Sequence, residues 1–320
     1  MKSESIPTSI IGGYLGSGKT TLINHLLKSC GNTRLAILIN DFGELPIDAS
    51  LIETEQGRII TLSGGCICCS YGNDLSAALK ELLQMNSSPE QIVIECSGVA
   101  LPDAVAFSLN LFRPLSLQCI LVMVDAETIK QQIDDRYIGD TIRRQLQSAD
   151  FVAINKCDLL GAERIQEIKQ WIEATCPDRA YLPTSHARLP ADLIVDTLLG
   201  ENQKRERALA VADNHLSEQH LCSANHDLSK YCSFTLTIDT AIDLQHMLAV
   251  LSQHSLLLRA KGYVRLGADC CHLVQIVGSR THVTEVNSPP QQLLNMLSCI
   301  ALSVDNTQKE LTEQLQLLTC

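Results

Sequence analysis

The segment GYLGSGKT, Gly13 to Thr20, constrains the fold of this chain more than any other stretch. It matches the pattern G-x-x-x-x-G-K-[ST], follows the apolar run Thr8–Ile11 and opens the amphipathic stretch Thr21–Lys28. A strand–loop–helix unit of this kind turns backbone N–H groups around phosphate oxygens and aims the positive end of a helix at them. The segment therefore predicts a phosphate-binding loop. A glycine-rich turn that binds nothing is the alternative, and the flanking strand and helix argue against it.

Two side chains of this loop carry the expected chemistry. Lys19 would contact the β- and γ-phosphates and stabilise the transferred charge, and Thr20 would offer its hydroxyl to Mg²⁺. The remaining predicted nucleotide contacts of the loop are Gly13, Gly16, Ser17, Gly18 and Thr21.

The rest of the first 200 residues alternates apolar runs with helical patterns. The further predicted strands are Leu35–Ile39, Gln91–Glu95, Cys119–Val124 and Phe151–Ile154. A second amphipathic stretch, Asp74–Gln84, could be capped by Asn73 or Asp74. Strands that alternate with helices indicate an α/β domain, here a P-loop NTPase domain with a mainly parallel sheet over residues 1–200.

The sequence NKCD, Asn155 to Asp158, follows the fifth predicted strand and so falls on the ligand edge of that sheet. A carboxylate at Asp158 can accept hydrogen bonds from N1–H and the exocyclic amine of guanine, a donor pair that adenine lacks. The motif therefore predicts GTP as the nucleotide, with Asn155 and Lys156 among its contacts. The loop from Pro183 to His186 is a weaker candidate for completing the base site.

A third polar position follows the strand in IVIECSG, Ile92 to Gly98. In a P-loop protein, a carboxylate at this strand end holds Mg²⁺ directly or through water, so Glu95 would share the ion with Thr20. Gly98 is expected close to the nucleotide. The alternative for Glu95 is an exposed strand end, and Asp125 is a weaker second polar candidate.

The segment GGCICCS places Cys66, Cys68 and Cys69 within four positions. Three interpretations are open: a transferable metal site, a thiol redox centre, and an inert buried cluster. We favour the metal site, because three thiolates leave the coordination shell open, which suits transfer, and because soft thiolates favour zinc or copper(I). Zinc is the predicted metal, with cobalt and nickel left open as alternatives. Cys96, Cys119 and Cys299 lie in apolar settings and are expected to be buried.

Residues 201–230 are polar and have no sustained periodicity, which predicts a linker. His215, His220, Cys222 and His226 lie in it, either as further zinc ligands or, as we favour, in a solvated loop. Residues 231–320 predict a smaller α+β domain. Its predicted elements are strands Tyr231–Ile238, Leu257–Leu266, Leu273–Val277 and Ile300–Val304, and helices Asp243–Gln253 and Thr307–Leu318.

Composition excludes some functions. A net charge of −11 argues against general nucleic-acid binding, and no apolar run reaches the roughly 18 residues of a membrane helix. Fourteen cysteines without an export pattern indicate a reducing compartment. We expect a cytoplasmic protein with neither nucleic acid nor a membrane as a partner.

Five segments together resemble the CobW-type GTPase family, which is related to the nickel-inserting GTPases of urease and hydrogenase maturation. They are GGYLGSGKTT, NDFGELPIDASLI, GGCICC, IECSG with a downstream Pro102-Asp103, and NKCDLL. In the second half, RAKGYVRL resembles the family's C-terminal domain, so the resemblance covers the whole chain. It implies a GTP-hydrolysing metallochaperone with a client metalloprotein as partner. Whether the chain forms a homodimer is left open.

The resemblance also bears on the metal ligands. Glu44 and Cys68 match two members of an internal metal site of the family, whereas Ile39 stands where the third, a glutamate, is expected. The expected zinc ligands are therefore Cys66, Cys68, Cys69 and Glu44, and whether Glu44 or another group is the fourth ligand is left open. No water-positioning residue stands out, so slow intrinsic GTP turnover is expected. The alternatives are a thiol redox-sensing GTPase and a zinc buffer without significant hydrolysis.

Overall fold

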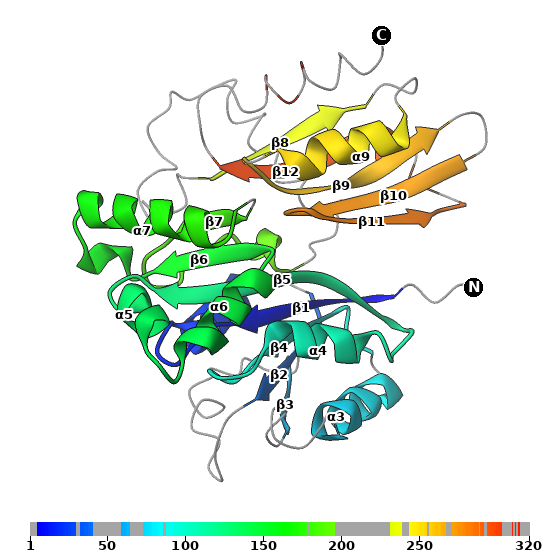
Figure 1. Cartoon of the computed structure of the whole chain (residues 1–320). Coiled ribbons are helices and arrows are strands. Elements are labelled where there is room, and N and C mark those ends of the chain that lie inside the picture. Colours follow the sequence, from blue (N-terminus) through cyan, green and yellow to red (C-terminus); the bar gives the residue numbers. More distant parts are fainter. Residues whose placement is uncertain are drawn as a thin grey trace. The chain divides into compact units, whose positions relative to one another are not determined.

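The computed structural model divides into two units, Met1–Asp196 and Thr197–Cys320, which are described separately (Figure 1). The described residues are 5–29, 33–40, 59–64, 73–85, 88–177, 179–195, 231–238, 243–254, 256–266, 270–287, 289–290, 293–302, 309, 311 and 313. The predicted linker at 201–230, with its three histidines, and most of the predicted helix at 307–318 lie outside them.

The first unit is built on a seven-stranded sheet with the order β3-β2-β4-β1-β5-β6-β7. All neighbouring strands run parallel. The strands are β1 (Ile6–Gly12), β2 (Leu35–Asn40), β3 (Ile59–Gly64), β4 (Gln91–Glu95), β5 (Leu115–Asp125), β6 (Phe151–Asn155) and β7 (Ala180–Pro183). The predicted parallel sheet is thus confirmed.

Burial explains why the central strands could be recognised. Every residue of β4 and of β6 is buried, as in strands whose two faces are both covered. Strands β3 and β7, which lie at the two edges of the sheet, were not predicted. As a result NKCD follows the sixth strand in chain order, not the fifth.

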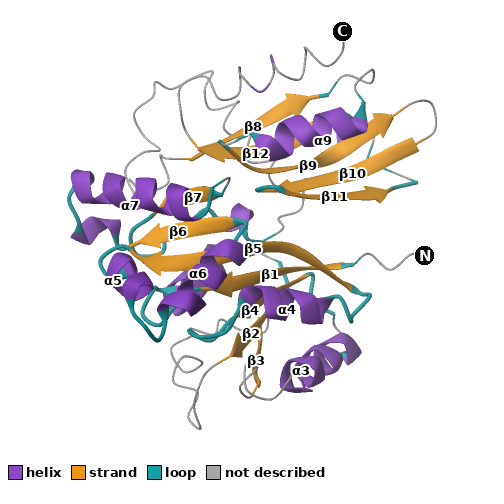
Figure 2. Cartoon of the chain, in the orientation of Figure 1, coloured by secondary structure: helices purple, strands orange, loops and turns teal. Residues whose placement is uncertain are grey.

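One face of this sheet is covered by a row of helices, shown in purple in Figure 2. The α-helices among the described residues of the unit are α1 (Lys19–Ser29), α3 (Asn73–Gln84), α4 (Pro102–Leu109), α5 (Ile129–Asp134), α6 (Gly139–Ser148) and α7 (Ala162–Thr175). Apolar side chains of α3 to α7 share one core cluster with Ile10 of β1 and Ile154 of β6. The predicted helices Thr21–Lys28 and Asp74–Gln84 correspond to α1 and α3.

Ile11, the neighbour of Ile10, is also buried but points to the opposite face, because side chains alternate along a strand. On that face Ser9 donates a hydrogen bond of 2.6 Å to the carbonyl oxygen of Ile194. Gln91 donates to the same oxygen, also at 2.6 Å. The chain just after the 3₁₀ turn η2 (Ala191–Leu193) is therefore tied to the sheet by buried polar groups, and α1 packs against η2.

The described part of the second unit has a five-stranded antiparallel sheet with the order β11-β10-β9-β12-β8, and it includes helix α9. Its elements are β8 (Tyr231–Thr237), α9 (Leu244–Gln253), β9 (Leu257–Leu266), β10 (Cys270–Val277), β11 (Arg280–Glu285) and β12 (Met296–Leu302). The predicted α+β character is confirmed. Strand β11 was missed, and β12 begins four residues before the predicted strand at 300.

At two positions of this unit, the local structure explains which residue type is present. The side chain of Asp243 caps α9 by accepting a hydrogen bond from the backbone N–H of His246 at 3.0 Å. In RAKGYVRL, a Cβ atom on Gly262 would collide with the carbonyl oxygen of Met296 on β12, so this position needs glycine. Cys299 is buried in the core of this unit, and Cys96 and Cys119 are buried in the first, as predicted.

Among the helices that the structure describes, none has the length and apolar character needed to cross a membrane.

Candidate nucleotide site

The loop between β1 and α1 has the backbone that its glycines allow. Gly13, Gly16 and Gly18 have φ angles of 131°, 77° and 103°, in the region that side chains disfavour. A Cβ on Gly13 would also collide with the carbonyl oxygen of Met123 on the neighbouring β5. The loop can therefore turn its N–H groups toward one centre only with glycine at these positions.

Lys19 is the first residue of α1 and its side chain folds back over the loop. Its Nζ donates hydrogen bonds to the carbonyl oxygens of Gly13 at 2.9 Å and Tyr14 at 3.3 Å. Lys19 is buried and its ammonium is held against the loop, where it can meet a phosphate.

Thr20 and Glu95 meet across two elements. Parallel pairing sets Ile11 of β1 beside Glu95 of β4, so the carboxylate reaches the start of α1. The hydroxyl of Thr20 donates to Oε1 of Glu95 at 3.2 Å, and Glu95 is only 2% exposed. The alternative of an exposed strand end is therefore wrong. These are hard oxygen donors, the type that Mg²⁺ prefers, so the pair fits that ion.

Cys96, directly after Glu95, is completely buried. Burial raises the pKa of its thiol to about 12, with smaller effects from Lys19, Glu95 and Asp103. The thiol stays protonated at neutral pH and serves as a small apolar group.

Asn155 joins the phosphate loop to the loop at 184–188. Its Nδ2 donates to the carbonyl oxygen of Ser17 at 2.9 Å, and its Oδ1 accepts from the backbone N–H of Ala187 at 2.9 Å. Asn155 is buried and ends β6. A single side-chain amide thus links both loops to the end of β6.

Asp158 lies beside the same loop. Its Oδ2 is 3.7 Å from Nε2 of His186, and its side chain is 34% exposed, which leaves it accessible to a base. The backbone N–H of Cys157 donates to the carbonyl oxygen of Thr184 at 3.1 Å. The structure therefore brings the weaker candidate loop, Pro183 to His186, together with NKCD. Thr21 is exposed on the first turn of α1.

Two buried hydroxyls near these groups have no hydrogen-bond partner within the described part of the chain. They belong to Ser17 in the phosphate loop and to Ser97, two residues after Glu95. Buried polar groups are normally satisfied, so unpaired hydroxyls beside a phosphate loop suit a polar ligand. Together with the glycine backbone and Lys19, they fit a nucleotide phosphate.

Gln145 on α6 is a residue that sequence reasoning missed. Its Nε2 donates to the carbonyl oxygens of Gly98 at 3.0 Å and Ala100 at 2.8 Å. It thereby clamps the segment that follows Glu95 to the helix layer. The only available signal was a polar residue between Ile142 and Leu146 on the buried face of the helix.

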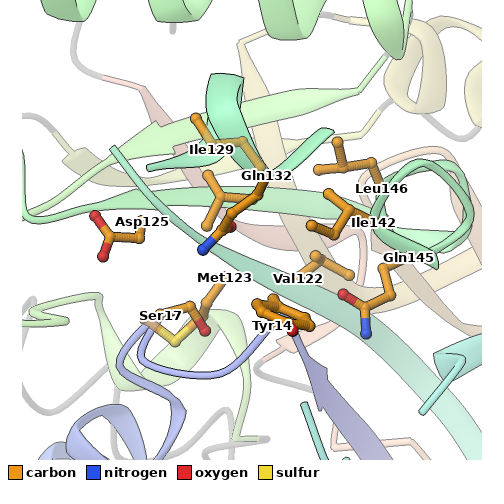
Figure 3. Close-up of a pocket in the computed structure, with 11 residues that line it drawn as sticks. Tyr14, Ser17, Val122, Met123, Asp125, Ile129, Gln132, Ile142, Gln145 and Leu146 are labelled. Atoms are coloured by element: carbon orange, nitrogen blue, oxygen red, sulfur yellow. The ribbon is translucent and has the colours of Figure 1, made fainter. Parts of the chain in front are cut away.

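A small cavity of about 10 Å³ lies between the phosphate loop and helices α5 and α6, with room for about one water molecule (Figure 3). Tyr14 and Ser17 close it on the loop side, while Gln132 and Gln145 point toward it from the helices. Asp125 lies at one end. A few polar groups of the phosphate loop and of the helix layer therefore line this cavity together with apolar side chains.

The predicted zinc ligands Cys66, Cys68, Cys69 and Glu44 lie outside the described residues. Within the ranges that are described, no group of three or more His, Cys, Asp or Glu side chains could hold a metal ion. Zinc ligation by those four residues therefore stays a prediction.

Comparison with known proteins gives two domain matches. Residues 7–183 match the model "CobW/HypB/UreG, nucleotide-binding domain", and residues 231–316 match "Cobalamin synthesis protein cobW C-terminal domain". The zinc chaperone CobW of Sinorhizobium sp is 27% identical over 308 residues, which cover 86% of each chain. The zinc chaperone CobW of Pseudomonas aeruginosa is 29% identical and covers 86% of this chain and 81% of its own.

A third relative is the zinc chaperone YjiA of Escherichia coli, which is 31% identical over 283 residues and covers 82% of this chain and 83% of its own. The nucleotide-binding model alone matches residues 7–183 of 320, more than half of the sequence. The chain therefore belongs to the CobW/HypB/UreG family.

Proposed function

We propose that this protein is a GTP-hydrolysing metallochaperone that binds zinc through its cysteine motif and transfers it to a client metalloprotein. One observation carries the nucleotide part: the side chain of Asn155 bonds the phosphate loop at Ser17 and the base-side loop at Ala187. Because this side chain links the phosphate loop to the motif proposed to read guanine, a single nucleoside triphosphate could contact both. The proposal takes residues 1–200 as the GTPase domain, 201–230 as a linker and 231–320 as the C-terminal domain.

Four side chains carry the proposed hydrolytic roles. Lys19, held against the phosphate loop, stabilises charge on the transferred phosphoryl group, and Asp158 reads guanine. Thr20 and Glu95 would hold Mg²⁺. When bound, Mg²⁺ would neutralise charge that develops on the phosphate oxygens. No residue of the motifs stands out from the sequence as the group that positions the attacking water, so we expect slow intrinsic turnover.

The proposed zinc binding is supported by the ligand chemistry of the cysteine motif and by the names of the relatives. Cys66, Cys68 and Cys69 supply soft ligands at close spacing, and Glu44 supplies a fourth donor in the segment that follows β2. The three relatives compared above are named zinc chaperones. Glu44 lies between the phosphate loop and the cysteines in sequence, where a nucleotide-sensitive segment would be. A coupling of about 1–3 kcal/mol between the two ligands would change zinc affinity about 5- to 150-fold, enough for capture and release.

Phosphate release tests this function. Reduced protein with Mg²⁺ should release phosphate from GTP and much less from ATP, and Lys19→Ala should abolish the release. Zinc should change the rate through the cysteine motif, so a Cys68→Ser variant should lose that response. A rate that responds to oxidation but not to zinc would favour a redox-sensing GTPase. Zinc binding without phosphate release would indicate a buffer. Either result would overturn the proposal.

A further inference from the structure

An ion pair joins the ends of two neighbouring strands. Asp125 is the last residue of β5, and Lys156 follows the last residue of β6. Parallel pairing aligns Asp125 with Asn155. The Nζ of Lys156 lies 2.5 Å from Oδ2 of Asp125. This pair therefore sits on the ligand edge of the sheet, next to the amide of Asn155 that links the two loops.

Burial and a hydrogen bond from the backbone hold the side chain of Asp125 in place. Its side chain is only 9% exposed, and its Oδ1 accepts a hydrogen bond from the backbone N–H of Glu127 at 3.0 Å. Its carbonyl oxygen accepts from the N–H of Thr128 at 3.2 Å. One carboxylate oxygen is thus used by the turn after β5, which leaves Oδ2 in a fixed place for the lysine.

Lys156 is fixed at its backbone as well. It has a φ angle of 64°, in the left-handed region that non-glycine residues rarely adopt. Asn155 on one side and Cys157 on the other are both hydrogen-bonded to the loop at 184–187. With its backbone and its ammonium both anchored, the methylene stem between them has little rotational freedom. Its side chain is 33% exposed, so a ligand can reach part of it.

Strained backbone conformations persist where the surroundings hold them, and they cluster at ligand sites. A lysine stem can also cover apolar surface while its ammonium bonds elsewhere. The face of a purine is such a surface. Lys156 stands two residues before Asp158, the predicted reader of the guanine edge.

We propose that Asp125 is a positioning residue of the guanine site, which holds the Lys156 ammonium so that the lysine stem is pre-ordered as a surface for the base. This inference rests on the proposed function, because it requires a guanine nucleotide at Asp158. The other interpretation is an ion pair that only stabilises the fold.

Equilibrium binding of a fluorescent GDP analogue to the full chain tests the proposal. Asp125→Asn keeps the size of the side chain and an acceptor for Glu127 but removes the charge. It should weaken GDP binding about two- to tenfold, the size of the ordering cost of one long side chain. Glu127→Gln is the matched control, because Glu127 is an exposed carboxylate two residues away. It should bind GDP like the unmodified chain.

Lys156 supplies the decisive comparison. Lys156→Met removes the ammonium but keeps most of the stem, so it should lose about the same factor as Asp125→Asn. The double variant should lose no more than either alone, and Lys156→Ala, without the stem, should bind GDP more weakly than Lys156→Met. If the ion pair only stabilises the fold, the variants should have lower melting temperatures and unchanged GDP affinity.

Unchanged GDP affinity in Asp125→Asn, or losses that add in the double variant, would overturn the inference. If Asp125→Asn does not fold, Lys156→Met alone decides, and unchanged affinity there would also overturn it. Failure of the proposed function looks different: the unmodified chain would then bind no guanine nucleotide at all.

Discussion

The hydroxyl of Thr20 donates a hydrogen bond to Oε1 of Glu95 across 3.2 Å, which joins the first turn of α1 to the end of β4. The two residues are 75 positions apart in sequence. They meet because β4 pairs directly with β1, the strand that leads into the phosphate loop. Strand order thus assembles a pair of oxygen donors suited to Mg²⁺ beside a lysine suited to phosphate.

Replacing Glu95 by Gln should separate metal-dependent turnover from nucleotide binding. The amide keeps the size of the side chain but holds Mg²⁺ poorly, so GTP turnover should fall about 100-fold, as when one preorganised electrostatic group is lost. GDP affinity measured without Mg²⁺ should stay unchanged. Glu173→Gln, on the exposed side of α7, is the control and should leave both quantities unchanged. Full turnover in Glu95→Gln would remove this residue from the magnesium site.

Asp158→Asn should change the preferred base. An amide offers one acceptor and one donor group, so it cannot accept from both N1–H and the exocyclic amine of guanine. GTP binding should weaken about 100-fold, while xanthosine triphosphate, which carries a carbonyl in place of that amine, should bind better than GTP. Competition of the two nucleotides against labelled GDP measures both effects. An unchanged preference for guanine would place the base elsewhere.

Gln145→Ala should destabilise the first unit. The change leaves the buried carbonyl oxygens of Gly98 and Ala100 without this donor, which should lower the free energy of unfolding by roughly 2–4 kcal/mol. Gln147→Ala, at an exposed position of the same helix, should change it by less than about 0.5 kcal/mol. Denaturant unfolding measures both. Equal stabilities of the two variants would show that this clamp contributes nothing.

The buried thiol of Cys96 gives a pH prediction. Its pKa is raised from 9.0 to about 12, so the unfolded chain loses this proton at lower pH than the folded chain does. The thiol's contribution to stability is therefore complete below pH 9 and is lost as pH rises toward 12.

The variant Cys96→Ala isolates this effect from the other groups that titrate in alkali. At pH 8 it should be about 1 kcal/mol less stable than the unmodified chain, because it leaves a small cavity. By about pH 11 it should be the more stable of the two, because it has no thiol that ionises on unfolding. Denaturant melts at both pH values test this, and a stability difference that does not change with pH would contradict the buried thiol.

Local sequence was sufficient for the parts of the fold that depend on local chemistry. A few consecutive residues were enough to predict three features: the glycines of the phosphate loop, the buried strands β4 and β6, and the NKCD motif. Edge strands were harder. β7 is only four residues long and ends in Pro183, and β11 has mainly exposed side chains and so lacks an apolar run.

The pairings within the candidate site depend on strand order, which a single sequence does not display. Asp125 and Lys156 meet because β5 and β6 are neighbours. Gln145 meets Gly98 only because α6 packs over the segment after β4. Neither contact follows from a motif, since each joins residues more than 30 positions apart.

The most direct test of the account is a competition titration of Zn²⁺ against a chromophoric chelator, with reduced protein and Mg²⁺. It would be performed with GDP and with a non-hydrolysable GTP analogue, beside a Cys68→Ser variant. The account predicts a tight zinc site whose affinity differs about 5- to 150-fold between the two nucleotides and falls in the variant. A zinc affinity that is the same with both nucleotides and in Cys68→Ser would contradict a GTP-gated zinc carrier.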